Sequence, residues 1–315
     1  MKSSLQATLG APVSLSGIGV HSGKTVNVHL HPAQANHGIV FLRTGLPNGR
    51  DRLIEARHAS VTATELCTVL GQRESGAVAT VEHLMSALSG LGIDNALIEI
   101  DGAEVPILDG SAAAFVDAID QVGIVRSRAV RKQIRVLRPV RVEKGIGSAE
   151  LLPNSKGFRL DVEIDFQNPI IGRQRKVVDL TPVSFRREIS RARTFGFIGD
   201  VEKLWKAGFA LGASLENTVA IGDDQVINPE GLRFADEFVR HKMLDAVGDL
   251  SLAGYPLLAT YRSYCSGHRL NVAVLEELLS DRANYAIVDG EARRESGYAE
   301  IGNGIAVPAY APDLH

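Results

Sequence analysis

The segment from Arg233 to Ala253 constrains the fold most, because it is the longest stretch with helical periodicity. Apolar residues cover one arc of this predicted helix: Val239, Met243, Leu244, Ala246, Val247 and Leu250. The other arc carries His241, Asp245 and Asp249 one turn apart, and Lys242 lies beside them. We expect the apolar arc to pack against a sheet and the polar stripe to be free to face a cleft.

His241 and Asp245 form a candidate metal site. A histidine and an aspartate one turn apart can place an imidazole nitrogen and a carboxylate oxygen on one metal ion. The same spacing is common in surface pairs, which stabilise a helix by roughly a few tenths of a kcal/mol. Taken alone, the spacing favours the surface pair.

A second candidate lies in Thr80-Val81-Glu82-His83, at the start of a predicted helix over Val81–Ser89. Thr80 is a suitable N-cap for that helix, and Gly90 is a suitable stop. A catalytic zinc needs a further protein ligand and a base beside its water, and His83 and Glu82 can fill these roles. Alternatively, Glu82 only complements the helix dipole and His83 is an ordinary histidine.

A third candidate is His268, in a turn between a predicted strand, Pro256–Tyr261, and a predicted helix, Asn271–Leu279. A histidine on a glycine-supported loop is well placed for proton transfer. Asp249 is a candidate partner that would fix its tautomer and stabilise its protonated form. Most loop histidines have no such function, so this signal is weak alone.

The arrangement of the remaining segments predicts an α+β fold. Strands and helices mix in both halves without a regular βαβ alternation, which favours mainly antiparallel sheets packed with helices. The length of 315 residues suggests two domains, which we place at 1–127 and 128–315. The basic stretch Arg126–Lys132 between them is either a linker or a solvated helix end. No fixed-period repeat is visible.

Composition excludes several functional classes. A net charge of −3 and an aromatic content of 5% do not suit nucleic-acid binding. No apolar run reaches the ~18 residues of a membrane span, and the N-terminus resembles neither a secretory signal nor a transit peptide. Cys67 and Cys265 form no metal or disulfide pattern, and Cys67 is more typical of a buried apolar residue than of a nucleophile. We therefore expect a cytoplasmic protein without a transmembrane segment.

Seven motifs, taken in order, combine into one resemblance. They are Thr80-Val81-Glu82-His83-Leu84, Gly92-Ile93-Asp94-Asn95, Pro106-Ile107-Leu108-Asp109-Gly110-Ser111-Ala112, Ser190-Arg191-Ala192-Arg193-Thr194-Phe195-Gly196-Phe197, Asn228-Pro229-Glu230-Gly231-Leu232-Arg233-Phe234, His241-Lys242-Met243-Leu244-Asp245 and Ser266-Gly267-His268. This series resembles the UDP-3-O-acyl-N-acetylglucosamine deacetylases, the zinc amidases of lipid A synthesis. The resemblance runs from about Gly17 to about Asn271.

The resemblance implies a catalytic metal site. His83, His241 and Asp245 match the zinc ligands of the family, and Glu82 matches the general base that takes a proton from the attacking water. Two histidines and one aspartate leave zinc an open position, as catalysis requires. Such a site also accepts Fe2+.

The resemblance also implies the remaining catalytic roles. His268 matches the general acid, a histidinium, and Asp249 the carboxylate that orients it. Thr194 matches the hydroxyl that hydrogen-bonds the oxyanion, and Lys242 a lysine near the sugar and phosphate end of the substrate. Cys265 stands where many relatives have a basic residue, which leaves Arg262 or Arg269 to make one phosphate contact.

The family architecture implies two domains of similar topology with the active site between them. An insert, at about 195–217 here, would form an apolar passage for an acyl chain, although ordinary core packing explains its apolar residues equally well. The residues expected to contact substrate are Leu66, Cys67, Phe195, Phe197, Ser214 and Lys242.

The implied reaction is hydrolysis of the N-acetyl group of UDP-3-O-acyl-N-acetylglucosamine, giving UDP-3-O-acyl-glucosamine and acetate, the committed step of lipid A synthesis. We expect a monomer whose only partner is this small acylated UDP-sugar. The alternative enzyme is a zinc amidase acting on another N-acetylated sugar or on a peptide. A protein with a purely structural metal is disfavoured, because structural zinc is usually held by cysteine-rich clusters.

Overall fold

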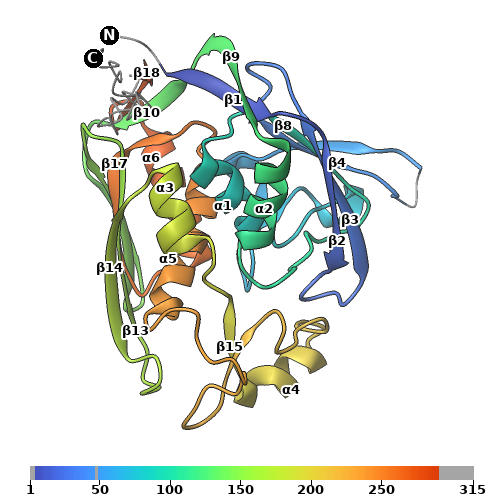
Figure 1. Cartoon of the computed structure of the whole chain (residues 1–315). Helices are drawn as coiled ribbons and strands as arrows, with labels where there is room; N and C mark the ends of the chain where they lie inside the picture. Colours follow the sequence, from blue (N-terminus) through green and yellow to red (C-terminus); the bar gives the residue numbers. More distant parts are fainter. Residues whose placement is uncertain (1–3, 47–48, 291–315) are drawn as a thin grey trace, which may run out of the picture.

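Two β-sheets form the outer layers of the protein, and the main helices lie between them (Figure 1). The computed structural model describes residues 4–46 and 49–290. The predicted α+β class is confirmed, and so is the mainly antiparallel pairing of the strands. Everything beyond residue 290 in the predicted second domain lies outside the described residues.

The first sheet has the strand order β2-β3-β8-β4-β5. Its strands are β2 (Val13–Ile18), β3 (Thr25–Pro32), β8 (Ala96–Ile100), β4 (Ile39–Arg43) and β5 (Arg52–Glu55). All neighbours pair antiparallel except β4 and β8, which are parallel. In β3, Val26, Val28 and Leu30 are buried and alternate with more exposed polar residues, as expected for a sheet covered on one face.

The second sheet repeats this arrangement with the order β11-β12-β17-β13-β14. Its strands are β11 (Val140–Lys144), β12 (Gly147–Pro153), β17 (Leu257–Tyr264), β13 (Phe158–Asp165) and β14 (Arg173–Asp179). Again one central pair, β13 and β17, is parallel and the others are antiparallel. Two further strands, β10 (Lys132–Val136) and β18 (Tyr285–Asp289), extend this sheet. The expectation of two similar topologies is confirmed.

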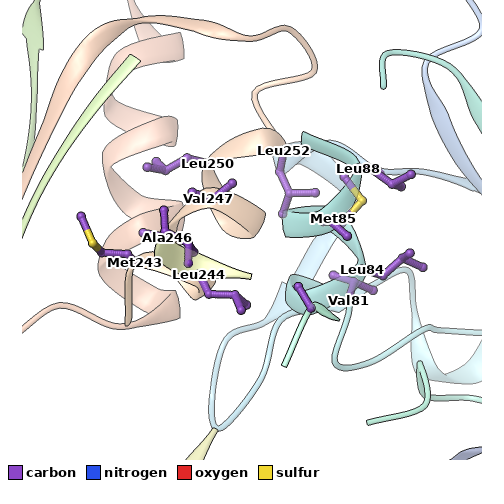
Figure 2. Close-up of a cluster of buried hydrophobic side chains, with 14 of the residues drawn as sticks. Val81, Leu84, Met85, Leu88, Met243, Leu244, Ala246, Val247, Leu250 and Leu252 are labelled. Carbon is purple, nitrogen blue, oxygen red and sulfur yellow. The ribbon is translucent and has the colours of Figure 1, made fainter. Parts of the chain in front are cut away.

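Each sheet and its helices form one of two similar units, and each unit has two helices at equivalent places in its order of elements. They are α1 (Glu82–Leu91) and α2 (Ala113–Val122) in the first, and α5 (Glu237–Ser251) and α6 (His268–Ser280) in the second. α1 packs directly against α5, and Figure 2 shows buried apolar side chains on and beside these two helices. The labelled side chains are Val81, Leu84, Met85, Leu88, Met243, Leu244, Ala246, Val247, Leu250 and Leu252. The expectation that the long helix packs against a sheet is confirmed, because α5 contacts β13 and β14 as well as α1.

The remaining elements are smaller than these sheets and helices. They are β1 (Leu5–Leu9), β6 (Val61–Ala63), β7 (Val69–Leu70), β9 (Ile124–Val130), α3 (Pro182–Ser184) continued by a turn of π-helix (Phe185–Ile189), β15 (Phe195–Phe197), α4 (Ile198–Lys206), β16 (Val219–Ile221) and two 3-10 turns (His58–Ser60 and Arg73–Ser75). β9 pairs antiparallel with β1. The alternative of a helix end at Arg126–Lys132 is therefore wrong, because β9 runs to Val130 and β10 begins at Lys132. That this stretch links two domains stays a prediction.

Two glycines allow close contacts at α1. A Cβ atom at Gly248 would lie 2.0 Å from the carbonyl oxygen of Glu82, so α5 crosses the start of α1 at backbone distance. A Cβ atom at Gly90 would lie 2.4 Å from the ring of Phe185. Gly90 is therefore a packing position, and Gly92, with a φ of 79°, ends the helix instead.

The predicted N-cap of α1 is also wrong. Val81 occupies the cap position and makes no side-chain capping bond. Thr80 has a positive φ of 55°, and its hydroxyl donates to Glu104 Oε1 at 3.0 Å. The Thr80 hydroxyl is therefore bonded to the buried carboxylate of Glu104 and does not cap the helix.

A short internal repeat, not recognised in the sequence, underlies the resemblance of the two units. The same residue types follow at the same spacing in α1 and α5: Val81, His83, Met85 and Gly90 correspond to Val239, His241, Met243 and Gly248. The match is too short to stand out as a fixed period. The two histidines therefore occupy equivalent positions on equivalent helices.

Candidate active site

Three buried side chains converge where α1 meets α5. The ligand atoms of His83, His241 and Asp245 all lie within 4.8 Å of one another. Nε2 of His83 is 3.6 Å from Asp245 Oδ1, and Nε2 of His241 is 3.3 Å from the same oxygen. The expectation that the polar stripe of α5 faces a cleft is wrong, because α1 packs against α5 and His241, Asp245 and Asp249 are buried.

The protonation of two of these residues suits metal binding. His241 Nδ1 donates to the carbonyl of Ala192 at 3.1 Å, which leaves Nε2 with its lone pair toward Asp245. Burial lowers the pKa of His241 to about 3, so its ring is neutral near pH 7. Burial alone would raise the pKa of Asp245, but His241 and Lys242 outweigh it and hold that pKa well below its usual range. Lys242 Nζ donates to Asp245 Oδ2 at 2.9 Å.

The residues present fit a divalent metal ion. Among the described residues, Asp245 Oδ1 and His83 Nδ1 are buried without a hydrogen-bond partner. Buried polar atoms are rarely left unpaired, and a cation beside Asp245 Oδ1 would supply the missing interaction there. Two imidazoles and one carboxylate are typical ligands of catalytic zinc and also suit iron.

Glu82 lies beside this cluster as the first residue of α1. Its Oε2 accepts the backbone N–H of Thr68 at 3.0 Å, and its Oε1 is 3.8 Å from His268 Nε2. Burial raises the pKa of Glu82, and His268 and His83 oppose part of that shift. A buried carboxylate with a raised pKa is a stronger base than an exposed one.

His268 forms a hydrogen-bonded pair with Asp249. Its Nδ1 is 2.8 Å from Asp249 Oδ2. Burial alone would lower the pKa of His268, but Asp249 and Glu82 outweigh it and raise that pKa to about 10. The ring is therefore an imidazolium near neutral pH. His268 is the first residue of α6 rather than part of the preceding turn, which corrects the sequence prediction.

The structure places several of the other predicted residues beside the cluster. The Phe195 ring packs 6.1 Å from the His241 ring, and Lys242 Nζ lies 5.5 Å from the Phe195 ring centre. The backbone of Thr194 is fixed by a bond from its N–H to the carbonyl of Gly110 at 2.8 Å. Thr194 and Phe195 approach the cluster from the segment that follows β14, whereas Lys242 lies on α5 itself.

Four expected substrate contacts have different surroundings. Phe197 packs against the ring of Phe166, and Leu66 is exposed with a positive φ of 66°. Cys67 is buried, and burial raises its pKa to about 12, which agrees with the prediction of a buried apolar residue. Ser214 is exposed and bonded within its own turn, so the described contacts do not bring it to the cluster.

The segment 195–217 packs against the core only at its start, through Phe195 and Phe197. No residue of α4 is buried, and Trp205 and Leu211 are each 54% exposed. Its backbone is held by the loop after β2, because Leu211 and Gly212 donate to the carbonyls of His21 and Val20. In Figure 1 α4 lies apart from the main helices between the two sheets.

Arg262 does not stand free as a substitute for a basic residue at Cys265. It pairs with Glu150 at 3.0 Å and with Asp161 at 3.3 Å on the second sheet. Arg269 is exposed, at the second position of α6.

Sequence reasoning missed two residues that complete the site, Thr68 and Asn271. The Thr68 hydroxyl donates to Asp249 Oδ1 at 2.7 Å, and Asn271 Nδ2 donates to Asp249 Oδ2 at 2.8 Å. Asn271 could have been found, because it lies three residues after His268 on one helix. For Thr68 the only signal was its position next to Cys67.

The helices of the described ranges include none that is long and apolar enough to cross a bilayer.

Comparisons with known proteins agree with this geometry. The family model described as UDP-3-O-acyl N-acetylglycosamine deacetylase matches residues 6–280. Proteins named UDP-3-O-acyl-N-acetylglucosamine deacetylase from Brucella ovis and from Brucella melitensis biotype 2 are each 52% identical over 286 residues, covering 90% of this chain and 98% of theirs. The chain belongs to the UDP-3-O-acyl N-acetylglycosamine deacetylase family.

Proposed function

We propose that this chain hydrolyses the N-acetyl group of UDP-3-O-acyl-N-acetylglucosamine, giving acetate and UDP-3-O-acyl-glucosamine in lipid A synthesis. The observation that carries the proposal is the pairing of a buried base with a cationic acid beside the metal ligands. Glu82 Oε1 and His268 Nε2 are 3.8 Å apart, and both adjoin the cluster of His83, His241 and Asp245. Hydrolysis of an amide needs both groups, because the water must lose a proton and the amine must gain one.

We assign zinc to the three ligands, with Fe2+ as the alternative metal. When bound, the metal supplies polarisation of the amide carbonyl and makes water more acidic. Lys242 holds the second oxygen of Asp245, and Ala192 holds the ring of His241. Such contacts keep ligands oriented before the metal binds.

Glu82 accepts the proton of the attacking water at its Oε1, because its Oε2 is already held by the Thr68 N–H. His268 then donates from Nε2 to the nitrogen of the leaving amine. Its Nδ1 is held by Asp249, so Nε2 is the ring nitrogen that is free to transfer a proton. Thr194 donates its hydroxyl to the oxyanion, and one such donor typically contributes about 10²–10³ in rate.

The segment 195–217 is proposed as the passage for the acyl chain, and its exposed apolar residues support this role. Lys242 would contact the sugar and phosphate end, together with Leu66, Cys67, Phe195, Phe197 and Ser214 as further substrate contacts. The domain limits 1–127 and 128–315, the monomeric state and a cytoplasmic location stay predictions.

The test is metal analysis of the purified protein combined with deacetylase assays on three substrates. We expect one equivalent of metal and activity that requires the 3-O-acyl chain. Equal rates on the unacylated UDP-sugar or on an N-acetylated peptide would favour the alternative amidase. No acetate release from the acylated UDP-sugar by metal-loaded protein would overturn the proposal.

A further inference from the structure

All three polar groups of Thr68 form hydrogen bonds, and their partners lie at the start of α1 and on α5. Thr68 is fully buried, just before β7. Its N–H donates to Glu82 Oε2 at 3.0 Å, and its hydroxyl donates to Asp249 Oδ1 at 2.7 Å. Its carbonyl accepts the N–H of Val81, the residue before Glu82, at 3.4 Å. One residue is thus bonded to the proposed base on α1 and to the partner of the proposed acid on α5.

The other side of Asp249 is fixed independently of Thr68. Its Oδ2 accepts from His268 Nδ1 and Asn271 Nδ2, each at 2.8 Å. Asn271 Oδ1 in turn accepts from Tyr261 at 2.5 Å and from Ser266 at 2.7 Å, so the amide cannot rotate without losing both bonds. The Thr68 hydroxyl is therefore the only donor to Asp249 Oδ1 among the described residues.

We infer that Thr68 is a positioning residue that sets the spacing between the general base Glu82 and the Asp249–His268 pair. The inference rests on the proposed function, because it takes the roles of these groups from there. Both contacts come from atoms of a single rigid residue, so Glu82 and Asp249 cannot move apart while both hydrogen bonds persist. Proton transfer depends steeply on such spacing, since it requires hydrogen-bond reach.

Loss of the Thr68 hydroxyl should change the pH at which His268 releases its proton, an effect that a loss of packing alone would not have. His268 faces Asp249 and Asp245 from α5, Glu82 from α1 and His21 from the loop between β2 and β3. Removing a neutral donor from Asp249 leaves its negative charge more available to His268. The proton shared by the pair should then be held more tightly, which moves its release to higher pH.

The experiment compares Thr68→Val with Thr68→Ser in the metal-loaded enzyme. Valine keeps the size and the backbone N–H but removes the hydroxyl, whereas serine keeps the hydroxyl and removes the methyl. We expect Thr68→Val to lower kcat by about 10- to 100-fold with little change in KM. We expect Thr68→Ser to retain kcat within about threefold, because it restores the bond to Asp249.

Thr62→Val is the matched control. Thr62 lies in β6, the strand that pairs with β7. Its hydroxyl donates to the carbonyl of Gly71 at 2.7 Å and not to a proposed catalytic group. We expect its kcat and pH profile to equal those of the wild type.

A second readout follows the His268 ring by NMR titration without turnover. In Thr68→Val the titration should move to higher pH, and in Thr68→Ser it should return toward the wild-type value. Wild-type kcat and titration in Thr68→Val, or equal defects in the valine and serine variants, would overturn the inference. An inactive wild type would instead overturn the proposed function, and the NMR comparison would still test the bond to Asp249.

Discussion

A methyl group added at Gly248 should lower the rate of the reaction strongly while it lowers the free energy of unfolding only slightly. In Gly248→Ala the new Cβ atom would lie 2.0 Å from the Glu82 carbonyl oxygen and 2.8 Å from its carbonyl carbon. Non-bonded heavy atoms at van der Waals contact are about 3.5–4.0 Å apart between carbons, so α1 and α5 must separate by roughly 1 Å or more.

The size of the two effects can be worked out separately. Replacing a helical glycine by alanine normally stabilises by about 1 kcal/mol. Overpacking a close contact costs about 1–3 kcal/mol, so the net loss of unfolding free energy should be about 0–2 kcal/mol. A displacement of about 1 Å at a catalytic group can cost about 10²-fold in rate, and Glu82 is the group that moves. The variant should therefore fold but turn over slowly.

The assay pairs denaturant unfolding with kcat/KM on the acylated UDP-sugar. Gly199→Ala serves as the stability control, because a Cβ there meets no atom within 4 Å and the residue also lies in a helix. Its unfolding free energy should equal or exceed the wild-type value. Wild-type kcat/KM and stability in Gly248→Ala would refute the reasoning that this backbone contact fixes Glu82.

Three further outcomes follow from the site. Glu82→Gln keeps the size of the side chain but cannot accept a proton, so kcat should fall by roughly 10²–10⁴ while metal analysis still finds the ion. Since His268 must be protonated to act, activity should fall as the pH rises toward its pKa of about 10. A kcat/KM profile should show this alkaline limb moved to lower pH in Asp249→Asn, which cannot offset the positive ring, and removed in His268→Ala. A chelator should abolish activity while circular dichroism shows most of the fold intact; global unfolding would instead indicate a structural metal.

The sequence predicted the elements of the site better than their assembly. The stripe of His241, Asp245 and Asp249 followed from helical periodicity alone, since residues one turn apart share a face. That His83 joins them required either the family resemblance or the fold, because α1 and α5 are remote in the chain. Burial of the stripe was not predictable, because periodicity does not reveal that α1 covers it.

Local signals failed where tertiary contacts overrode them. Thr80 has the residue type of an N-cap, but its hydroxyl bonds to Glu104. Gly90 looks like a helix stop, but it makes room for Phe185. The positioning role that we infer for Thr68 has no local signal in the sequence, because its partner Asp249 lies 181 residues away.

The repeated sheet order and the matched helices give the protein an internal pseudosymmetry that its chemistry has to break. Of the polar residues proposed for catalysis, the histidines His83 and His241 occupy matched positions on the two helices. Glu82 of α1 corresponds to Arg240 of α5, and Asp245 of α5 corresponds to Ala87 of α1. The proposed mechanism takes a proton at Glu82 and gives one from His268, and two identical halves could not divide these two roles. The division of roles therefore comes from the unmatched positions, while the matched ones hold the two helices together.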